Sequence, residues 1–315
     1  MARKRTGLPV DGWLAIDKPL GVTSARAVAA VRRATGATKV GHGGTLDPLA
    51  SGVLPIALGE ATKTVQYVMD GSKTYRWQVR WGEQRTTDDA EGDIVATCDR
   101  RPTAAEIEAA LGAFIGDILQ IPPAYSAIKV EGERAYDLAR SGEAPDLAPR
   151  RVRIHAFTLL GTPDADHADF ETVAGKGTYI RALARDLSQA LGTKGYVSRL
   201  RRTACGPFRE ENAISLETIE EVGQGPALRS HLLPVETALD DIPALALTEA
   251  EARRLRNGQA LPLLQVAARN PLAKIAQDTV VRAMDGRRVV ALARIAGGEI
   301  RPMRVIHSKT DDQQE

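Results

Sequence analysis

The sequence predicts an α/β protein with a small β-rich domain at its C-terminal end. From a first strand pattern at residues 11–16 to about residue 208, strand patterns alternate with segments whose apolar residues recur at helical spacing. This alternation is typical of helices packed on a sheet. After residue 247, one short helix pattern is followed by three short strand patterns. We therefore expect two domains, residues 1–247 and 248–315.

The composition is that of an ordinary globular protein and argues against several other classes. The 315 residues are 43% hydrophobic and 26% charged, which suffices to bury a core without cross-links. No apolar stretch is long enough to cross a bilayer, and no apolar segment of a secretion signal follows the basic N-terminus. Cys98 and Cys205 lie far apart and predict neither a disulfide framework nor a metal cluster. We therefore expect a cytoplasmic protein without a metal. We also expect a monomer, because no heptad or exposed apolar stripe demands a dimer.

Charge and helix ends give two further constraints. The net charge is only +2, so a nucleic-acid surface would require local clustering of Arg and Lys.

Thr23 or Ser24 can cap a helix over residues 25–34. Capping boxes, in which Thr and Glu three positions apart bond each other's backbone, begin at Thr103 and Thr248 and open two further helices.

A loop around Asp47 places one carboxylate in a constrained setting. Gly43 and Gly44 permit backbone conformations closed to other residues, and Pro48 biases Asp47 toward an extended or turn shape. The apolar residues 53–58 can anchor this loop to a core. Asp before Pro is also ordinary turn chemistry. The residues alone therefore leave open whether Asp47 is a turn residue or a reactive group on a rigid support.

The residues at 41–55, Gly-His-Gly-Gly-Thr-Leu-Asp-Pro-Leu-Ala-Ser-Gly-Val-Leu-Pro, closely resemble the nucleophile motif of the TruB family of pseudouridine synthases. At Gly43 that family more often has Thr. Lys-Pro-Leu-Gly-Val-Thr-Ser at 18–24 and Gly-Thr-Tyr-Ile-Arg at 177–181 resemble two further family motifs. In bacteria the family makes pseudouridine at position 55 in the T-arm of tRNA.

The resemblance implies a fold, a chemistry and a partner. The fold would be a mixed, largely antiparallel sheet with helices, followed by a PUA-like RNA-binding domain over residues 248–315. The partner would be tRNA, whose target uridine must be flipped out of the folded arm before chemistry. Because the reaction is an isomerisation, it requires no redox cofactor, nucleotide or metal.

The resemblance also assigns roles to single residues. Asp47 would be the nucleophile, at C6 of the base or C1′ of the sugar. Tyr75 would hold the base and help to remove the C5 proton, and Arg181 would pair with Asp47. Residues assigned to substrate binding are His42, Tyr179, Leu200, Lys18 and Asp89.

Local patterns agree with two of these assignments. Residues 73–81 alternate as a half-buried strand, so Tyr75 is either a core residue or a base-stacking platform. Arg181 falls in the first turn of a helix whose apolar residues recur from Ile180 to Leu191, where the helix dipole disfavours a cation. An Arg at such a site needs an anionic partner, and Asp47 would serve.

The acidic segment at 85–93 has a simpler interpretation. Its spacing does not fit a calcium-binding EF-hand loop, so we predict a solvated hairpin turn without a metal. Only the resemblance places Asp89 near the catalytic pocket.

Two other stretches suggest contact with RNA. The family resemblance predicts a mobile insert near residues 120–150 that grips the RNA arm, although a surface loop with incidental charge explains any one of its residues equally well. Three arginines within residues 199–202 favour contact with phosphates. The residues of the insert that suit phosphates and loop bases are Tyr125, Lys129, Arg134 and Arg140.

The C-terminal region carries weaker signals. Residues 234–247 are predicted to form a helix and a linker. Asp285-Gly286 between apolar runs indicates a hairpin, and residues 300–306 predict another strand. We expect the last residues, 308–315, to be disordered.

Two functions from other classes compete with the family interpretation. An RNA-binding or RNA-folding factor without chemistry would share the basic clusters but would not need Asp47. A glycoside-type hydrolase would pair Asp47 with a second carboxylate at a defined separation. Glu60 and Asp89 are the acids available for it, and the arginine clusters would then be unexplained.

Overall fold

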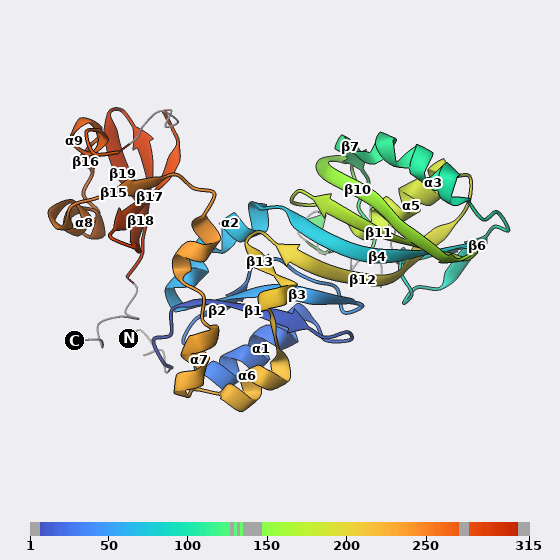
Figure 1. The fold of residues 1–315 in the computed structure, drawn as a ribbon, viewed down its shortest axis with the longest axis horizontal. Helices are drawn as coiled ribbons and strands as arrows, with labels where there is room; N and C mark the ends of the chain where they lie inside the picture. Colours follow the sequence, from blue (N-terminus) through green and yellow to red (C-terminus); the bar gives the residue numbers. More distant parts are fainter. Residues whose placement is uncertain (1–6, 127–128, 131–132, 135–146, 271–276, 308–315) are drawn as a thin grey trace.

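The computed structural model describes residues 7–126, 129–130, 133–134, 147–270 and 277–307 (Figure 1). Two sheets organise the molecule, one of ten strands and one of five, beside two small two-stranded ribbons. The helix pattern around Arg140 and the tail at 308–315 lie outside the described residues. Among the described residues, no helix is long and apolar enough to cross a membrane.

The ten-stranded sheet forms the first domain, in the order β14-β1-β3-β12-β4-β11-β10-β7, with β13 beside β12 and β2 beside β3. Only the β1–β14 and β3–β12 pairs are parallel, so the predicted mixed, largely antiparallel sheet is confirmed. In chain order the elements are β1 (Gly12–Lys18), α1 (Ser24–Thr35), β2 (Val40–His42), β3 (Ala50–Leu58), the 3₁₀ helix η1 (Gly59–Thr64), α2 (Val65–Asp70), β4 (Lys73–Trp81), β5 (Glu83–Arg85), β6 (Ile94–Thr97), α3 (Ala104–Leu111), η2 (Gly112–Phe114), β7 (Gly116–Gln120), β8 (Lys129–Val130), β9 (Glu133–Arg134), β10 (Arg150–Asp164), β11 (His167–Ala174), α5 (Ile180–Ala190), β12 (Gly195–Cys205), β13 (Phe208–Arg209), η3 (Glu210–Asn212), β14 (Ile214–Ser215), α6 (Leu216–Val222) and α7 (Pro226–His231).

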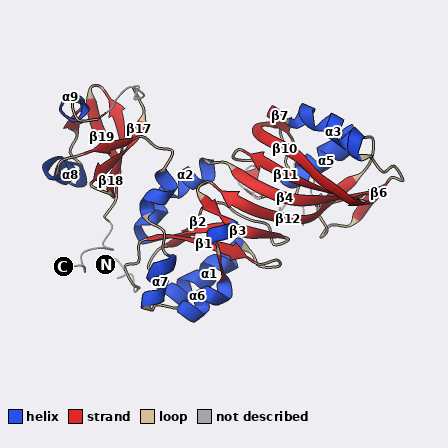
Figure 2. Ribbon diagram, viewed as in Figure 1, coloured by secondary structure: helices blue, strands red, loops and turns tan. Residues whose placement is uncertain are grey.

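Helices cover the two ends of this sheet separately (Figure 2). The helices α1, α6 and α7 lie against the end that contains β1 and β3, where Leu14, Ile16, Val31 and Leu54 are fully buried. The helices α3 and α5 cover the other end, around Trp77 and neighbouring aromatic rings. Between these two helical layers the middle of the sheet, at β3, β12 and β4, stays available for a site.

Helix ends follow the predicted capping chemistry. Thr23 accepts a hydrogen bond from the Arg26 backbone N–H at the start of α1, and both capping boxes are present, at Thr103 and Thr248. After α5, Gly192 has φ of +67°, a left-handed conformation that favours glycine. These local signals fix where the helices begin and end.

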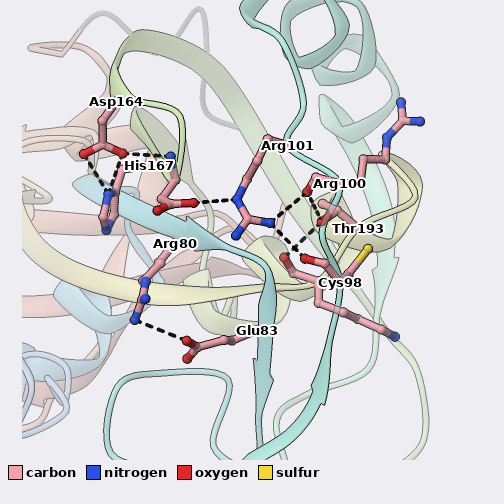
Figure 3. Close-up of polar contacts among 10 residues, drawn as sticks. Arg80, Glu83, Cys98, Arg100, Arg101, Asp164, His167 and Thr193 are labelled. Carbon is pink, nitrogen blue, oxygen red and sulfur yellow. Dashed lines mark hydrogen bonds and ion pairs between the residues drawn. The ribbon is translucent and has the colours of Figure 1, made fainter.

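Polar contacts hold the end of the sheet that lies far from the second domain (Figure 3). The Arg101 guanidinium donates to Asp166 at 2.5 Å, and Thr193 donates to the Arg100 carbonyl at 2.8 Å. The His167 ring lies 2.8 Å from Asp164 within the β10–β11 turn. Cys98, in the same region, and Cys205 are free cysteines.

The second sheet has the order β15-β17-β18-β19-β16, and the predicted hairpin at Asp285-Gly286 joins β17 to β18. Instead of the helix predicted in 234–247, the chain forms the short 3₁₀ helix η4 and then β15, which pairs with β17. The second sheet therefore begins slightly before the predicted boundary after residue 247. Its elements are η4 (Val235–Leu239), β15 (Ala244–Ala246), α8 (Glu249–Arg256), β16 (Leu261–Pro262), α9 (Leu263–Ala267), β17 (Val280–Asp285), β18 (Arg288–Ala296) and β19 (Glu299–Val305).

Apolar and polar contacts join the two sheets. Trp13 and Phe208 of the first domain share a buried cluster with Leu292 and Ile306 of the second. Beside this cluster, the Lys63 ammonium donates to the Val305 carbonyl at 2.7 Å and to Glu60 at 2.6 Å. The second domain is therefore packed onto the first rather than tethered by a linker.

Candidate active site

A cleft of about 1040 Å³ lies where β3, β12 and β4 meet the start of α5. A smaller hollow of about 180 Å³ shares Asp47, Asp89, Arg181 and Leu200 with it. Clefts of this size usually hold small molecules or single groups of larger ones. Six of the sequence-predicted site residues line the large cleft, from five separate parts of the chain: Asp47, Tyr75, Asp89, Tyr179, Arg181 and Leu200.

The Asp47 loop, residues 43–49, is held by hydrogen bonds on both sides. The Ser24 hydroxyl, at the start of α1, donates to the Leu46 carbonyl and accepts from the Leu46 N–H, both at 2.9 Å. The Pro48 carbonyl accepts from the Gly21 N–H at 2.8 Å. The loop backbone therefore has fixed partners, while the Asp47 side chain remains 39% exposed to the cleft.

Arg181 connects Asp47 to the opposite wall. Its side chain is only 6% exposed, and one guanidinium nitrogen lies 2.9 Å from the Asp47 carboxylate. The other lies 3.6 Å from Asp89 and donates to the Thr87 carbonyl at 2.9 Å. Such charge-assisted contacts orient a carboxylate. The ion pair expected from the position of Arg181 in its helix is present.

The acidic segment forms the predicted hairpin turn, between β5 and β6, but it is only partly solvated. Asp88 and Asp89 are 6% and 7% exposed. Asp89 accepts from the Thr87 hydroxyl, and Asp88 pairs with Arg185 at 3.1 Å. Burial raises the pKa of Asp88 to about 6, although Arg185 and Arg181 act in the opposite direction. Helix α5 supplies the two cations that draw this segment into the core, and a local reading of the sequence could not anticipate that.

Aromatic and apolar side chains form the rest of the wall. Burial raises the pKa of the Tyr75 phenol, and the nearby Arg202 guanidinium partly opposes this. Leu200 lies on β12 opposite Ala50 of β3 and Trp77 of β4. Both Tyr75 and Leu200 pack against the cores on either side of the cleft.

Tyr179 stands at the first residue before α5. Its backbone exchanges two hydrogen bonds with the Gln120 amide, at 2.8 and 3.2 Å. The Arg150 guanidinium lies 4.8 Å from the centre of its ring, a cation–π distance. Tyr179 is therefore fixed by the edge strand β7 and its neighbour β10 as well as by its own helix.

Two residues assigned to substrate binding are not among those that line the cleft. Lys18 is fully buried and donates to the Pro19 and Val22 carbonyls at 2.9 and 2.6 Å. Burial lowers its pKa to about 8, although Asp47 opposes the shift. His42 ends β2, and burial lowers its pKa too, assisted by Arg202.

The departure from the family pattern at Gly43 has a packing reason. A β-carbon there would lie 2.7 Å from a Val68 methyl group, so a larger residue would require Val68 to shift. With glycine at position 43, the Gly43 N–H still donates a hydrogen bond to the Pro55 carbonyl.

The prediction that the arginines at 199–202 contact phosphates is wrong for two of them. Arg202 is 1% exposed. Arg201 pairs with Asp17 at 3.0 Å and with Glu210 at 2.9 Å. Arg199 lines the small hollow. Strand alternation places Arg201 and Arg202 on opposite faces of β12, but only the packed sheet decides which of the two faces is buried.

Sequence reasoning also missed Lys73, which lines the cleft although it is 7% exposed. Its ammonium donates to the carbonyls of Met69 and Gly71 at the end of α2, at 2.5 and 2.6 Å. Within the described part of the chain, no three His, Cys, Asp or Glu side chains are grouped as metal ligands.

Solved structures identify the fold. The Cbf5 chain of an archaeal box H/ACA sRNP Nop10–Cbf5 complex aligns with 98% of this chain and 94% of its own length, at a TM-score of 0.72 and 23% identity. A box H/ACA RNP bound to a substrate RNA containing 2′-deoxyuridine gives the same TM-score. The molecule thus has the fold of these Cbf5-type proteins.

Sequence comparisons define the family within that fold. The model for the N-terminal domain of TruB family pseudouridylate synthases matches residues 32–180, and that for the tRNA pseudouridylate synthase B C-terminal domain matches residues 181–240. The tRNA pseudouridine synthase B of Rhodospirillum rubrum is 56% identical over 98% of this chain and 100% of the relative. That of Gluconacetobacter diazotrophicus is 55% identical over 96% and 100%. The chain belongs to the TruB family of pseudouridylate synthases.

Proposed function

We propose that this enzyme converts uridine to pseudouridine at position 55 in the T-arm of tRNA, in the cytoplasm and as a monomer. One observation carries the proposal: a carboxylate on a braced loop, Asp47, is held by a buried arginine inside a cleft large enough for a nucleotide. Family membership supports the class of reaction, and relatives named tRNA pseudouridine synthase B support the substrate.

The reaction moves one bond and one proton. Asp47 adds to C6 of the base or to C1′ of the sugar, and the C1′–N1 bond breaks. The uracil turns within the cleft, and C5 bonds to C1′. The proton on C5 leaves, N1 gains a proton, and Asp47 is released, so that atoms and electrons balance. Asp47 must be anionic to attack, and the charge-assisted contact with Arg181 orients its carboxylate.

The walls of the cleft hold the base. Tyr75 presents an aromatic face on which uracil stacks and helps to remove the C5 proton. Leu200 and Tyr179 shape the pocket, while Asp89 orients Arg181 from the side opposite Asp47. The uridine reaches these groups only after it leaves its stack.

His42 and Lys18 take part from outside the cleft. His42 fills the space that the flipped base vacates in the RNA. Lys18 supports the turn before α1 that braces the Asp47 loop. The segment near residues 120–150 and the PUA-like domain over 248–315 supply further contacts to the RNA.

The test uses an unmodified tRNA transcript incubated with the protein and with Asp47→Asn. Pseudouridine is mapped by a base-specific chemical adduct that stops primer extension, and a transcript with cytidine at position 55 is the RNA control. We expect one T-arm stop that requires both uridine 55 and Asp47. Salt-sensitive tRNA binding by both proteins without any stop would instead establish an RNA-binding factor.

A further inference from the structure

Arg202 is the buried cation nearest to the Asp47 loop that the reaction above does not use. It lies on β12, is 1% exposed and is among the largest fully buried side chains. None of the ion pairs found among the described residues involves it, unlike its neighbour Arg201. A buried guanidinium is costly unless its donors are satisfied, so its contacts indicate what it is retained for.

Those contacts go to both ends of the Asp47 loop. Arg202 donates to the carbonyls of Gly44 at 3.0 Å and Thr45 at 3.3 Å, before Asp47. It also donates to the Val53 carbonyl at 2.8 Å, after Asp47. One rigid fork of donors thus ties the strand that leaves the loop to the segment that enters it.

The backbone of Arg202 adds a second constraint. In the parallel β3–β12 pair it lies opposite Gly52, and in the antiparallel β4–β12 pair it lies opposite Tyr75. Gly52 has φ of +101°, and a β-carbon there would lie 2.2 Å from the Arg202 carbonyl oxygen. Glycine at 52 therefore allows β3 to approach Arg202 closely.

The guanidinium also reaches the aromatic wall. Its positive charge acts to lower the pKa of the Tyr75 phenol, against the larger effect of burial. The same residue thus hydrogen-bonds the segment of the proposed nucleophile and lies beside the residue proposed to hold the base.

We propose that Arg202 is a positioning residue that fixes Asp47 and Tyr75 relative to each other, acting through the Gly44, Thr45 and Val53 carbonyls. This inference rests on the proposed function of Asp47. Because misplacement of a reacting group by about 1 Å costs about 100-fold in rate, loss of Arg202 should slow chemistry without weakening RNA binding.

The experiment compares Arg202→Met with Arg201→Met, its neighbour on the other face of β12. RNA labelled with tritium at C5 of the target uridine reports the single-turnover rate, and filter binding reports Kd for the RNA. We expect Arg202→Met to lower the rate about 100-fold and to change Kd less than about threefold. Arg201→Met should leave the rate within about threefold of wild type.

A second measurement needs no catalysis. Hydrogen–deuterium exchange of the peptide over residues 41–53 should quicken in Arg202→Met and not in Arg201→Met, because this segment loses the three hydrogen bonds that Arg202 donates to it. If wild type released no tritium, the proposed function would fail, while this exchange result would still report on the loop.

Arg202→Lys covers the case in which the Met variant does not fold. Lysine keeps the charge but lacks the fork, so we expect partial rescue, with a rate between those of wild type and Arg202→Met. A folded Arg202 variant with a rate within threefold of wild type would overturn the proposal. So would an equal rate loss in Ile107→Ala, a fully buried residue of α3 chosen to match the loss of Tm, because the effect would then be general destabilisation.

Discussion

The two domains of this enzyme are built from different interiors. In the first domain, buried polar or charged side chains are frequent, and they include Lys18, Lys73, Asp88, Arg181 and Arg202. Among the described residues after Thr203, none of the buried side chains is polar or charged. The core of the second domain consists of aliphatic residues such as Leu255, Val281 and Ile300.

This difference shows that buried charges, which are unfavourable for folding, are concentrated in the domain that contains the cleft. Burying a charge is unfavourable unless it is paired or hydrogen-bonded. The buried cations of the first domain each hold a loop or a helix end next to the cleft. Neither of the two cavities described above is lined by residues of the second domain, and apolar packing can hold its described part together. Its surface, rather than its interior, is available to RNA.

Removing a charge from the first domain should have the largest effect. Arg181→Met leaves Asp47 and Asp89 without their shared cation, so we expect the single-turnover rate to fall at least about 100-fold. Stability should fall by about 3 kcal/mol, as expected for breaking a buried pair, measured by urea unfolding. The matched variant is Arg185→Met, one helical turn later, which should destabilise similarly and lower the rate less than about tenfold. Equal rates for the two variants would contradict the role of Arg181.

Truncating the second core should change stability alone. Leu255 is fully buried among the aliphatic residues of the second domain, so Leu255→Ala should cost about 3 kcal/mol of unfolding free energy. The single-turnover rate at saturating RNA should stay within about threefold of wild type. A rate loss as large as that of Arg181→Met would show that the second core also positions the cleft.

The raised pKa of Asp88 should make the stability of the protein depend on pH. Its pKa is about 6 in the folded protein against 3.8 in a model compound, so between these values the folded state binds more protons than the unfolded state. The contribution of Asp88 to stability is therefore greatest at low pH and is lost as the pH rises from about 4 to 6, by at most about 3 kcal/mol. In urea titrations, the wild type should therefore lose stability relative to Asp88→Asn as the pH rises across that range. A constant difference would mean that Asp88 titrates normally.

The contribution of Lys18 to stability should change with pH in the opposite direction, and at alkaline pH. Burial lowers its pKa from 10.5 to about 8, so the unfolded state binds more protons between these values. Wild type should therefore gain stability relative to Lys18→Met as the pH rises from about 8 to about 10.5. The same urea titrations at alkaline pH measure this, and Arg201→Met, whose cation is half exposed, should show no such rise.

Among these variants, loss of the Lys63 contact between the domains should change the free energy of unfolding least. Lys63, which is 27% exposed, pairs with Glu60 and also bonds the Val305 carbonyl. Because water and salt screen a partly exposed pair, Lys63→Met should cost about 1 kcal/mol or less. Repeating the unfolding in 1 M salt should shrink the difference, whereas a salt-independent loss would point to packing of the lysine stem.

Local patterns predicted much of the fold, and the family resemblance predicted six of the residues that line the cleft. The capping boxes at Thr103 and Thr248, the alternation around Trp77 and the Asp285-Gly286 hairpin all depend on neighbours within a few positions. The roles of Asp47 and Tyr75 came from resemblance to a family and remain predictions. The burial of Asp88 and of Arg202 depends on partners far away in the chain, and no local pattern contained that information.

The sequence by itself determined the elements, their caps and the braced loop that carries Asp47, because these follow from spacing and backbone preferences. Only the tertiary structure decided which charges face the cleft. Arg202 and Arg201 are adjacent and chemically identical, yet one is buried against the Asp47 loop and the other pairs with Asp17 at the surface. The physical reason is that desolvation and pairing depend on which strands lie alongside β12, and strand order is a property of the whole sheet.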